Sequence, residues 1–236
     1  MRVEVDTVSK RFGGLLALDC VSLCAQAGAV TAVIGPNGAG KSTLLGCLSG
    51  MVPIDSGRVM IDGAGVSLSS PGKLVDLGIT RTFQNLRLFE GLSAKEHLDL
   101  ARRSLRRTGR AAPDSMTLLA RVGLDGKAAL RPSALSYGER RRLEIARGLA
   151  TSPRLFLIDE PAAGSTPSEQ FVLADLIRGI AEDGVAVILV EHHMDLVARA
   201  SKQVVVLNFG RVLVTGTIAD VRRNPEVIAA YLGTAA

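Results

Sequence analysis

Short apolar runs separated by polar, glycine-containing segments set the hydrophobic pattern of this chain. Val30–Ile34 and Leu155–Ile158 are short apolar runs that predict strands. Val185–Val190 is continuously apolar, as expected of a strand buried on both faces of a sheet. Val3–Val8 alternates apolar and polar residues, which predicts an edge strand. Further strand-like segments lie at residues 17–23, 57–63 and 78–82, and a hairpin is expected at 204–207 and 212–215. With helical segments between the strands, this pattern predicts an α/β fold.

The segment from 84 to 150 follows a helical pattern and contains no good strand. It comes after a predicted loop at 67–76. Ser93 and Glu96 form an S-x-x-E capping box that opens a helix to about Arg107. Further helices are expected at 116–122 and 135–150.

These elements predict one domain that spans residues 1–236. Residues 1–83 and 151–236 are expected to form its strand-and-helix core, and residues 84–150 an inserted helical lobe. The chain should end in a helical segment at 219–232, interrupted near Pro225, because proline breaks a helix.

A glycine-rich segment follows the first apolar run directly. It consists of Gly35, Pro36, Asn37, Gly38, Ala39, Gly40, Lys41, Ser42 and Thr43. It satisfies the G-x-x-x-x-G-K-[ST] pattern of a phosphate-binding loop, with the strand before it and the helix after it that the motif requires. Glycines let backbone N–H groups approach a polyphosphate, and a helix N-terminus favours an anion. Lys41 adds a full charge near the outer phosphates, and the Ser42 hydroxyl can ligate Mg²⁺.

Polar side chains also follow three other predicted strands. Gln84 could reach a metal or its water, although a lone Gln is usually a surface residue. Asp159 could bind a metal and Glu160 could polarise an attacking water, the alternative being a solvated acidic turn. His192 could contact a terminal phosphate or simply pack. Because ligands bind at the carboxyl ends of strands in open α/β sheets, we expect these groups to converge on the phosphate-binding loop.

Two further features have both an ordinary and a functional interpretation. Phe12 lies at a predicted turn, where its ring could stack on a base or pack against neighbours. A helix start is formed by Leu135, Ser136, Tyr137, Gly138 and Glu139. Ser136 and Glu139 match a capping box, but Ser, Gly and free helix N–H groups can also face a phosphate. Spacing alone favours the simple cap.

Charge and hydropathy narrow the classes of function. The segment from Arg102 to Arg147 carries eleven Arg and one Lys against four acidic residues, so it is strongly basic within a chain of net charge +5. It lacks interleaved aromatic residues, which favours a solvated face or an acidic partner surface over nucleic acid. No apolar run reaches the roughly 18 residues of a membrane span, and the N-terminus lacks the apolar core of a signal peptide. We therefore expect a cytoplasmic protein.

Together and in this order, the motifs resemble those of ATP-binding subunits of ABC transporters, over essentially the whole chain. GPNGAGKST matches the phosphate loop of that family, Gln84 in TFQN its Q-loop, LSYGE its signature LSGGQ, FLIDEP its acidic strand and His192 its switch histidine. The resemblance implies a P-loop NTPase with a RecA-like core, an N-terminal antiparallel β subdomain and an inserted α-helical subdomain. It also implies subunits that pair head to tail around two ATP molecules.

The resemblance assigns roles residue by residue. Phe12 would stack on adenine, and residues 35–43 would bind the phosphates of ATP. Mg²⁺ would be held by Ser42, Gln84 and Asp159. Glu160 would be the catalytic base, with Gln84 and His192 as further catalytic groups. Residues 135–139 would act in trans on the ATP of the partner subunit, an anion site that is compatible with the helix cap.

The chain departs from the family pattern at four positions. Tyr137 replaces the first glycine of LSGGQ and Glu139 replaces its glutamine, whereas Gly138 is kept. Thr166 stands where the D-loop of the family usually carries Asp. His193 follows the switch histidine where a similar subgroup has Asp.

Within the family, RTFQNLRLF, LSYGERRRLEIARGLA and NPEVIAAYLG are most similar to subunits of branched-chain amino acid importers. The expected function is therefore ATP hydrolysis that powers uptake of branched-chain or related amino acids. The alternatives are the ATPase of a lipopolysaccharide or lipid exporter, whose signature segment is similar, and a non-transport ABC ATPase. A phosphate-loop kinase or GTPase would not need LSYGE or His192, and a module that binds nucleotide without turnover would not consume ATP.

The importer resemblance also implies partners and a location. We expect a homodimer or a pair with a paralogous ATPase subunit, two transmembrane permease subunits and an extracytoplasmic solute-binding protein, without nucleic acid. The chain would lie peripherally on the inner face of the plasma membrane.

Overall fold

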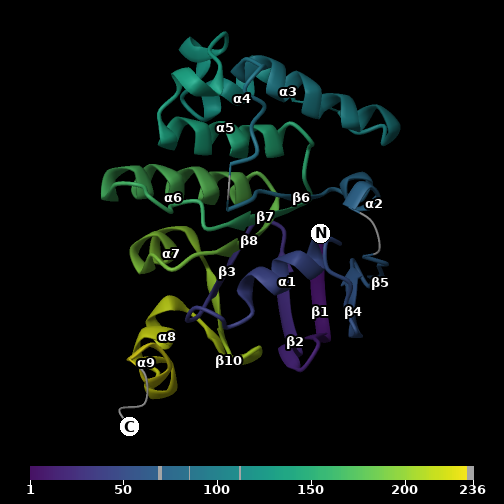
Figure 1. Cartoon of the computed structure of the whole chain (residues 1–236), viewed down its shortest axis with the longest axis vertical. Helices are drawn as coiled ribbons and strands as arrows, with labels where there is room; N and C mark the ends of the chain where they lie inside the picture. The colour runs from purple at the N-terminus through teal and green to yellow at the C-terminus, as the bar shows by residue number, and fades with distance from the viewer. Residues whose placement is uncertain (69–70, 85, 112, 233–236) are drawn as a thin grey trace.

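Two β-sheets and the helices around them make up the computed structural model, which describes residues 1–68, 71–84, 86–111 and 113–232 (Figure 1). The larger, six-stranded sheet has the order β10-β9-β3-β8-β7-β6. Its strands are β3 (Val30–Ile34), β6 (Ile79–Arg81), β7 (Leu155–Asp159), β8 (Ala186–Val190), β9 (Gln203–Asn208) and β10 (Arg211–Gly216). Neighbours pair in parallel except for the β9–β10 hairpin. Every residue of β3, β7 and β8 is buried, as predicted for β8 from its continuous apolar run.

The smaller sheet is antiparallel and has the order β2-β1-β4-β5. It consists of β1 (Arg2–Phe12), β2 (Leu15–Gln26), β4 (Ser56–Ile61) and β5 (Ala64–Gly65). The prediction that Val3–Val8 forms an edge strand was wrong, because β1 lies between β2 and β4. Alternating apolar and polar residues indicate a strand with one buried and one exposed face. In a sheet that is covered on one side, central and edge strands both have this pattern, so it does not distinguish them.

In the segment from 84 to 150, the described residues form helices and no strand. The elements are α3 (Ala94–Arg103), η1 (Ser104–Arg107), α4 (Ser115–Arg121), η2 (Asp125–Lys127), η3 (Pro132–Ala134) and α5 (Tyr137–Leu149). Ser93 and Glu96 form the predicted capping box at the start of α3. These helices share one buried cluster with β7 and β8, in which a Cβ on Gly148 would lie 2.4 Å from the ring of Phe156. The signature-bearing helix is therefore packed directly onto the large sheet.

The remaining helices are α1 (Lys41–Leu48), α2 (Pro71–Asp76), α6 (Pro167–Glu182), α7 (Met194–Ala200), α8 (Ile218–Arg223) and α9 (Pro225–Leu232). The predicted loop at 67–76 contains α2, because proline fits the first turn of a helix as well as a loop. The C-terminal helix is interrupted at Asn224, as predicted. Asn85 of TFQN and residues 233–236 lie outside the described residues. Among the described residues, no helix is long and apolar enough to cross a membrane.

Candidate functional site

The glycine-rich loop joins β3 to α1 and needs its glycines for two reasons. Gly35 has a φ of +151°, and a Cβ there would lie 2.1 Å from the carbonyl oxygen of Leu207 in β9. Gly40 has a φ of +101°, and a Cβ there would lie 2.6 Å from the carbonyl oxygen of Ala17 in β2. Gly38 has open space around it, but its φ of +80° is one that other residues rarely adopt. The loop is therefore closely packed against β9 of the large sheet and β2 of the small sheet.

Lys41 opens α1 with its ammonium group folded over the loop. Its Nζ donates hydrogen bonds to the carbonyl oxygens of Gly35 and Pro36, at 2.7 and 2.9 Å. Burial lowers the pKa of Lys41, and the negative charges of Glu160 and Asp159 oppose that shift. The N-cap residue, Gly40, supplies no side-chain cap, and the first turn of α1 contains no acidic residue. A positively charged end of a helix is thus left for an anion.

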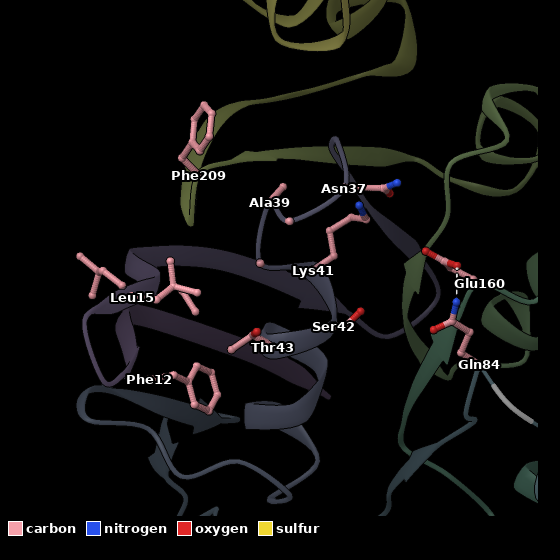
Figure 2. A pocket seen from close by; sticks show the side chains of 14 residues that line it. Phe12, Leu15, Asn37, Ala39, Lys41, Ser42, Thr43, Gln84, Glu160 and Phe209 are labelled. Atoms are coloured by element: carbon pink, nitrogen blue, oxygen red, sulfur yellow. Dashed lines mark hydrogen bonds between the residues drawn. The ribbon is translucent and has the colours of Figure 1, made fainter. Parts of the chain in front are cut away.

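A cavity of about 520 Å³ opens beside this loop (Figure 2). It is lined by Phe12, Leu15, Leu16, Ala17, Asn37, Gly38, Ala39, Gly40, Lys41, Ser42, Thr43, Gln84, Glu160 and Phe209. The structure thus brings together the phosphate-binding loop, the turn aromatic and two of the polar groups that follow strands. Leu15 and Phe209 were missed by the sequence analysis. A Phe in a predicted turn was the available signal for Phe209.

The two acidic residues after β7 have different partners. Glu160 has a φ of +42°, and its Oε2 accepts a hydrogen bond of 3.1 Å from Nε2 of Gln84. The dashed line in Figure 2 marks this bond, which crosses from β7 to the segment after β6. Asp159 is buried and forms an ion pair of 2.8 Å with Arg81. The charge that compensates Asp159 therefore comes at least partly from Arg81, which sequence analysis did not single out.

His192 follows β8, the strand between β3 and β7, but its half-exposed side chain does not line the cavity. Its ring lies 4.1 Å, centroid to centroid, from that of His193. Nδ1 of His193 lies 2.9 Å from Oε2 of Glu191, which is fully buried. A similar subgroup of the family has Asp at this position. In this chain the position carries His193, whose ring lies beside the carboxylate of Glu191.

The helix start at residues 135–139 does not line this cavity either. Ser136 is the N-cap of α5, and it forms a capping box with Glu139. Glu139 also pairs with Lys127, and these hydrogen bonds lower the pKa of its carboxyl. Tyr137 is partly exposed and accepts a hydrogen bond from Arg141 at 3.0 Å. The interpretation of residues 135–139 as a helix cap is thus confirmed. If the same residues also bind a phosphate, that phosphate must come from outside their own cavity.

Arg141 connects this helix start to the Gln84 segment, and sequence analysis missed it. Its guanidinium is 1% exposed and donates to the carbonyl oxygens of Phe83 and Gln84, both at 2.9 Å. It also pairs with the buried Glu144 at 3.2 Å, and Glu144 accepts from the N–H of Phe83. Burial raises the pKa of Glu144, against the effect of Arg141. A displacement of α5 would therefore move the backbone of Gln84.

One cavity brings together a phosphate-binding loop, a helix N-terminus and a carboxylate, on this arrangement of two sheets. These features define a P-loop ATPase of the ATP-binding cassette class. The family model described as ABC transporter matches residues 18–163, and one described as Branched-chain amino acid ATP-binding cassette transporter matches residues 211–236. The chain belongs to the ABC transporter family. The predicted fold class and the expectation of an ATP-binding, ATP-hydrolysing subunit are confirmed.

Named relatives agree with this assignment. The chain is 40% identical to the high-affinity branched-chain amino acid transport ATP-binding protein BraF of Pseudomonas aeruginosa, over 99% of this chain and 98% of the relative. It superposes on the ADP conformation of MJ1267, an ATP-binding cassette of an ABC transporter, with a TM-score of 0.88, 28% identity and 99% of both chains covered. It also resembles the dimeric, post-hydrolysis state of the cassette MJ0796 bound to ADP and Pi, with a TM-score of 0.77 and 25% identity over 92% of this chain and 98% of the other.

Proposed function

We propose that this chain hydrolyses MgATP between two subunits and thereby powers uptake of branched-chain or related amino acids. The observation that carries the proposal is the cavity at the N-terminus of α1, which gathers Lys41, Gln84 and Glu160. The amino acid class is supported by the similarity to BraF and by the family match at residues 211–236. The same relatives give no support to the export alternative.

The phosphates would lie over residues 35–43, with adenine toward Phe12. Mg²⁺ would be held by Ser42, Gln84 and Asp159, whose hydroxyl, amide and carboxylate oxygens are the donors that this hard cation prefers. The hydrogen bond from Gln84 to Glu160 supports this use, because it engages Nε2 and not the amide oxygen. Asp159 is buried with its Oδ2 paired to Arg81, so it would ligate through its other carboxylate oxygen. When bound, the cation neutralises charge on the outer phosphate oxygens.

Glu160 would act as the general base, a role that its position in the cavity lining supports. A water held by its carboxylate attacks the γ-phosphorus, forming one P–O bond as the bond to the β–γ bridging oxygen breaks. The water proton passes to Glu160, and ADP and phosphate leave. Gln84 orients the carboxylate through the bond at 3.1 Å, and His192 would contact the γ-phosphate once the sites close.

The proposed assembly contains a second subunit that completes each ATP site. Residues 135–139 would complete the ATP site of a second subunit, identical or paralogous, which agrees with their position outside their own cavity. Residues 84–150 would form the helical lobe, and residues 1–83 and 151–236 the core. Two permease subunits, an extracytoplasmic solute-binding protein and a position on the inner face of the plasma membrane complete the proposal.

Glu160→Gln tests the mechanism, because it keeps the side-chain volume but cannot accept the water proton. Loss of a general base costs roughly 10²–10⁴-fold in rate, so steady-state release of phosphate should nearly stop while ATP binding persists. Glu182→Gln, at the exposed end of α6, is the matched control and should hydrolyse ATP at the wild-type rate. Undiminished hydrolysis by Glu160→Gln would remove Glu160 from the role of base, and no consumption of ATP by the wild type in the assembled transporter would refute the enzyme.

A further inference from the structure

Phe209 lies at the tip of the β9–β10 hairpin with 85% of its surface exposed. Asn208 pairs with Arg211, and the two residues between them, Phe209 and Gly210, have φ angles of +45° and +76°. Positive φ at both central residues is typical of a type I′ turn, in which Asn-Gly is preferred. A bulky residue is strained at the first of these positions. The strained backbone opposes folding, and the exposed ring contributes little burial to offset that strain. Backbone outliers of this kind concentrate at functional sites.

The hairpin tip is fixed against the phosphate-binding loop. The N–H of Gly210 donates to the carbonyl oxygen of Ala39 at 3.1 Å, and the N–H of Asp19 donates to the carbonyl oxygen of Gly210 at 2.8 Å. A Cβ on Gly210 would lie 2.7 Å from the carbonyl oxygen of Ala17. The backbone that carries Phe209 is therefore held in register with both the loop and β2.

Phe209 lines the same cavity as Phe12 and Leu15, and it also lines a second cavity of about 530 Å³ on the side of α9. Figure 2 shows Phe12 and Phe209 far apart on two sides of Leu15, with the phosphate-binding loop beside them and the ring of Phe209 directed away from Phe12. Nζ of Lys10 lies 5.3 Å from the ring centroid of Phe12, so a cation already covers one face of that ring. The apolar end of the cavity thus has aromatic residues from two different sheets, and the exposed ring of Phe209 would have to turn toward a bound base to face Phe12.

We propose that Phe209 forms a second aromatic wall of the nucleobase subsite and packs against the adenine of ATP from the side opposite Phe12. The inference rests on ATP binding in this cavity, as proposed above. A purine presents two π-faces, and stacking on aromatic side chains stabilises a bound base. Contact with the base explains why a strained turn carries a Phe, since Asn at this position would relax the backbone and lose the stacking surface.

Phe209→Asn separates the two effects, because it creates the preferred Asn-Gly turn while removing the ring. The dissociation constants of ATP and of inorganic tripolyphosphate are measured by titration calorimetry on the full chain. The variant should bind ATP about tenfold more weakly, which corresponds to about 1.4 kcal/mol. Its affinity for tripolyphosphate should be unchanged, and its Tm should equal or exceed that of the wild type. If the ring of Phe209 had only a structural role, its removal in Phe209→Asn would lower Tm instead.

Phe171→Ala is the matched control, because Phe171 is also a half-exposed aromatic residue but lies on α6 outside the cavity lining. It should leave both dissociation constants unchanged. Unchanged ATP affinity in Phe209→Asn would overturn the inference, as would equal losses for ATP and tripolyphosphate or a loss of subunit pairing alone. If Phe12→Ala still weakens ATP binding in that case, the proposed function stands. If Lys41→Ala and Phe12→Ala also bind ATP normally, the proposed location of ATP fails as well.

Discussion

Glu191 is a fully buried carboxylate that connects two loops at the catalytic edge of the sheet. Its Oε1 accepts from the N–H of Ala162 at 3.0 Å, in the segment after Glu160. Its Oε2 accepts from the N–H groups of His192 and His193, at 2.7 and 3.0 Å. A buried charge is tolerated when hydrogen bonds surround it, and these donors supply them. Glu191 is therefore a positioning residue for the loops that carry Glu160 and His192.

Glu191→Gln should lower kcat for ATP hydrolysis about tenfold and leave KM within about twofold. An amide has only one acceptor oxygen, so its NH₂ group would face an N–H, and an unsatisfied buried group costs about 1–3 kcal/mol. The loss should appear in kcat because the phosphate-binding loop does not contact this carboxylate. Steady-state kinetics and Tm are measured together. A fall in Tm with normal kcat would show that Glu191 serves the fold only.

At the scale of single residues, the sequence allowed prediction of those functional groups that belong to a short local motif. The segment at 35–43 belongs to this class, because its spacing defines the phosphate-binding motif. The roles of the acidic pair after β7 stay a prediction that depends on that motif. Arg81, Arg141 and Glu191 could not be predicted in the same way. Their partners are remote in sequence or belong to the backbone: Arg81 pairs with Asp159 and Arg141 holds the carbonyl of Phe83. Only the folded chain brings such partners together.

At the scale of elements, His97 ties α3 to the segment that follows Gln84. It is 1% exposed, its Nε2 accepts from the N–H of Phe89 at 2.9 Å, and its Nδ1 lies 2.8 Å from the carbonyl oxygen of Ser93. These partners require the neutral ring. Burial lowers the pKa of His97; the charge of Arg147 acts in the same direction, while the contact with Ser93 and the charges of Glu90 and Glu96 oppose it.

His97 should make the protein less stable in acid. Its pKa is lower in the folded than in the unfolded chain, so the stability that it contributes is complete above about pH 6.5 and is lost as the pH falls below that value. His97→Gln stays neutral and should narrow the difference in Tm between pH 7.5 and pH 5.5. Equal differences in Tm for wild type and His97→Gln would contradict this.

The type of a secondary-structure element could be predicted from the sequence where all residues of the segment are buried. The strands β3, β7 and β8 appear in the sequence as mainly apolar runs because both faces of each are covered, with Thr31 in β3 and Asp159 at the end of β7 as the polar residues. The place of a strand in its sheet was not predictable, as the central position of β1 demonstrates. Pairing depends on contacts such as Val3 with Ile61, and these are invisible to local periodicity.

At the scale of the whole molecule, the signature segment has its own helix cap but no place in its own cavity. The capping box satisfies the N–H groups of Ser136 and Glu139. The N–H groups of Tyr137 and Gly138 belong to the first turn of α5, where intrahelical acceptors are lacking. Together with the Ser136 hydroxyl they form a surface suited to an anion from outside the subunit. In the proposed head-to-tail dimer, the triphosphate bound by the partner subunit would lie at that place.

Mixing two inactive variants tests this arrangement. Lys41→Ala damages the phosphate-binding loop, whereas Ser136→Asp keeps a good N-cap and places a negative charge against the triphosphate of the partner. Each variant alone should hydrolyse little ATP. In a mixed dimer, one site combines the intact loop of one subunit with the intact signature of the other, so an equal mixture should recover about one quarter of the wild-type rate if sites act independently. If the signature acts within its own subunit, both members of every pair stay defective, and the mixture will be no more active than its components.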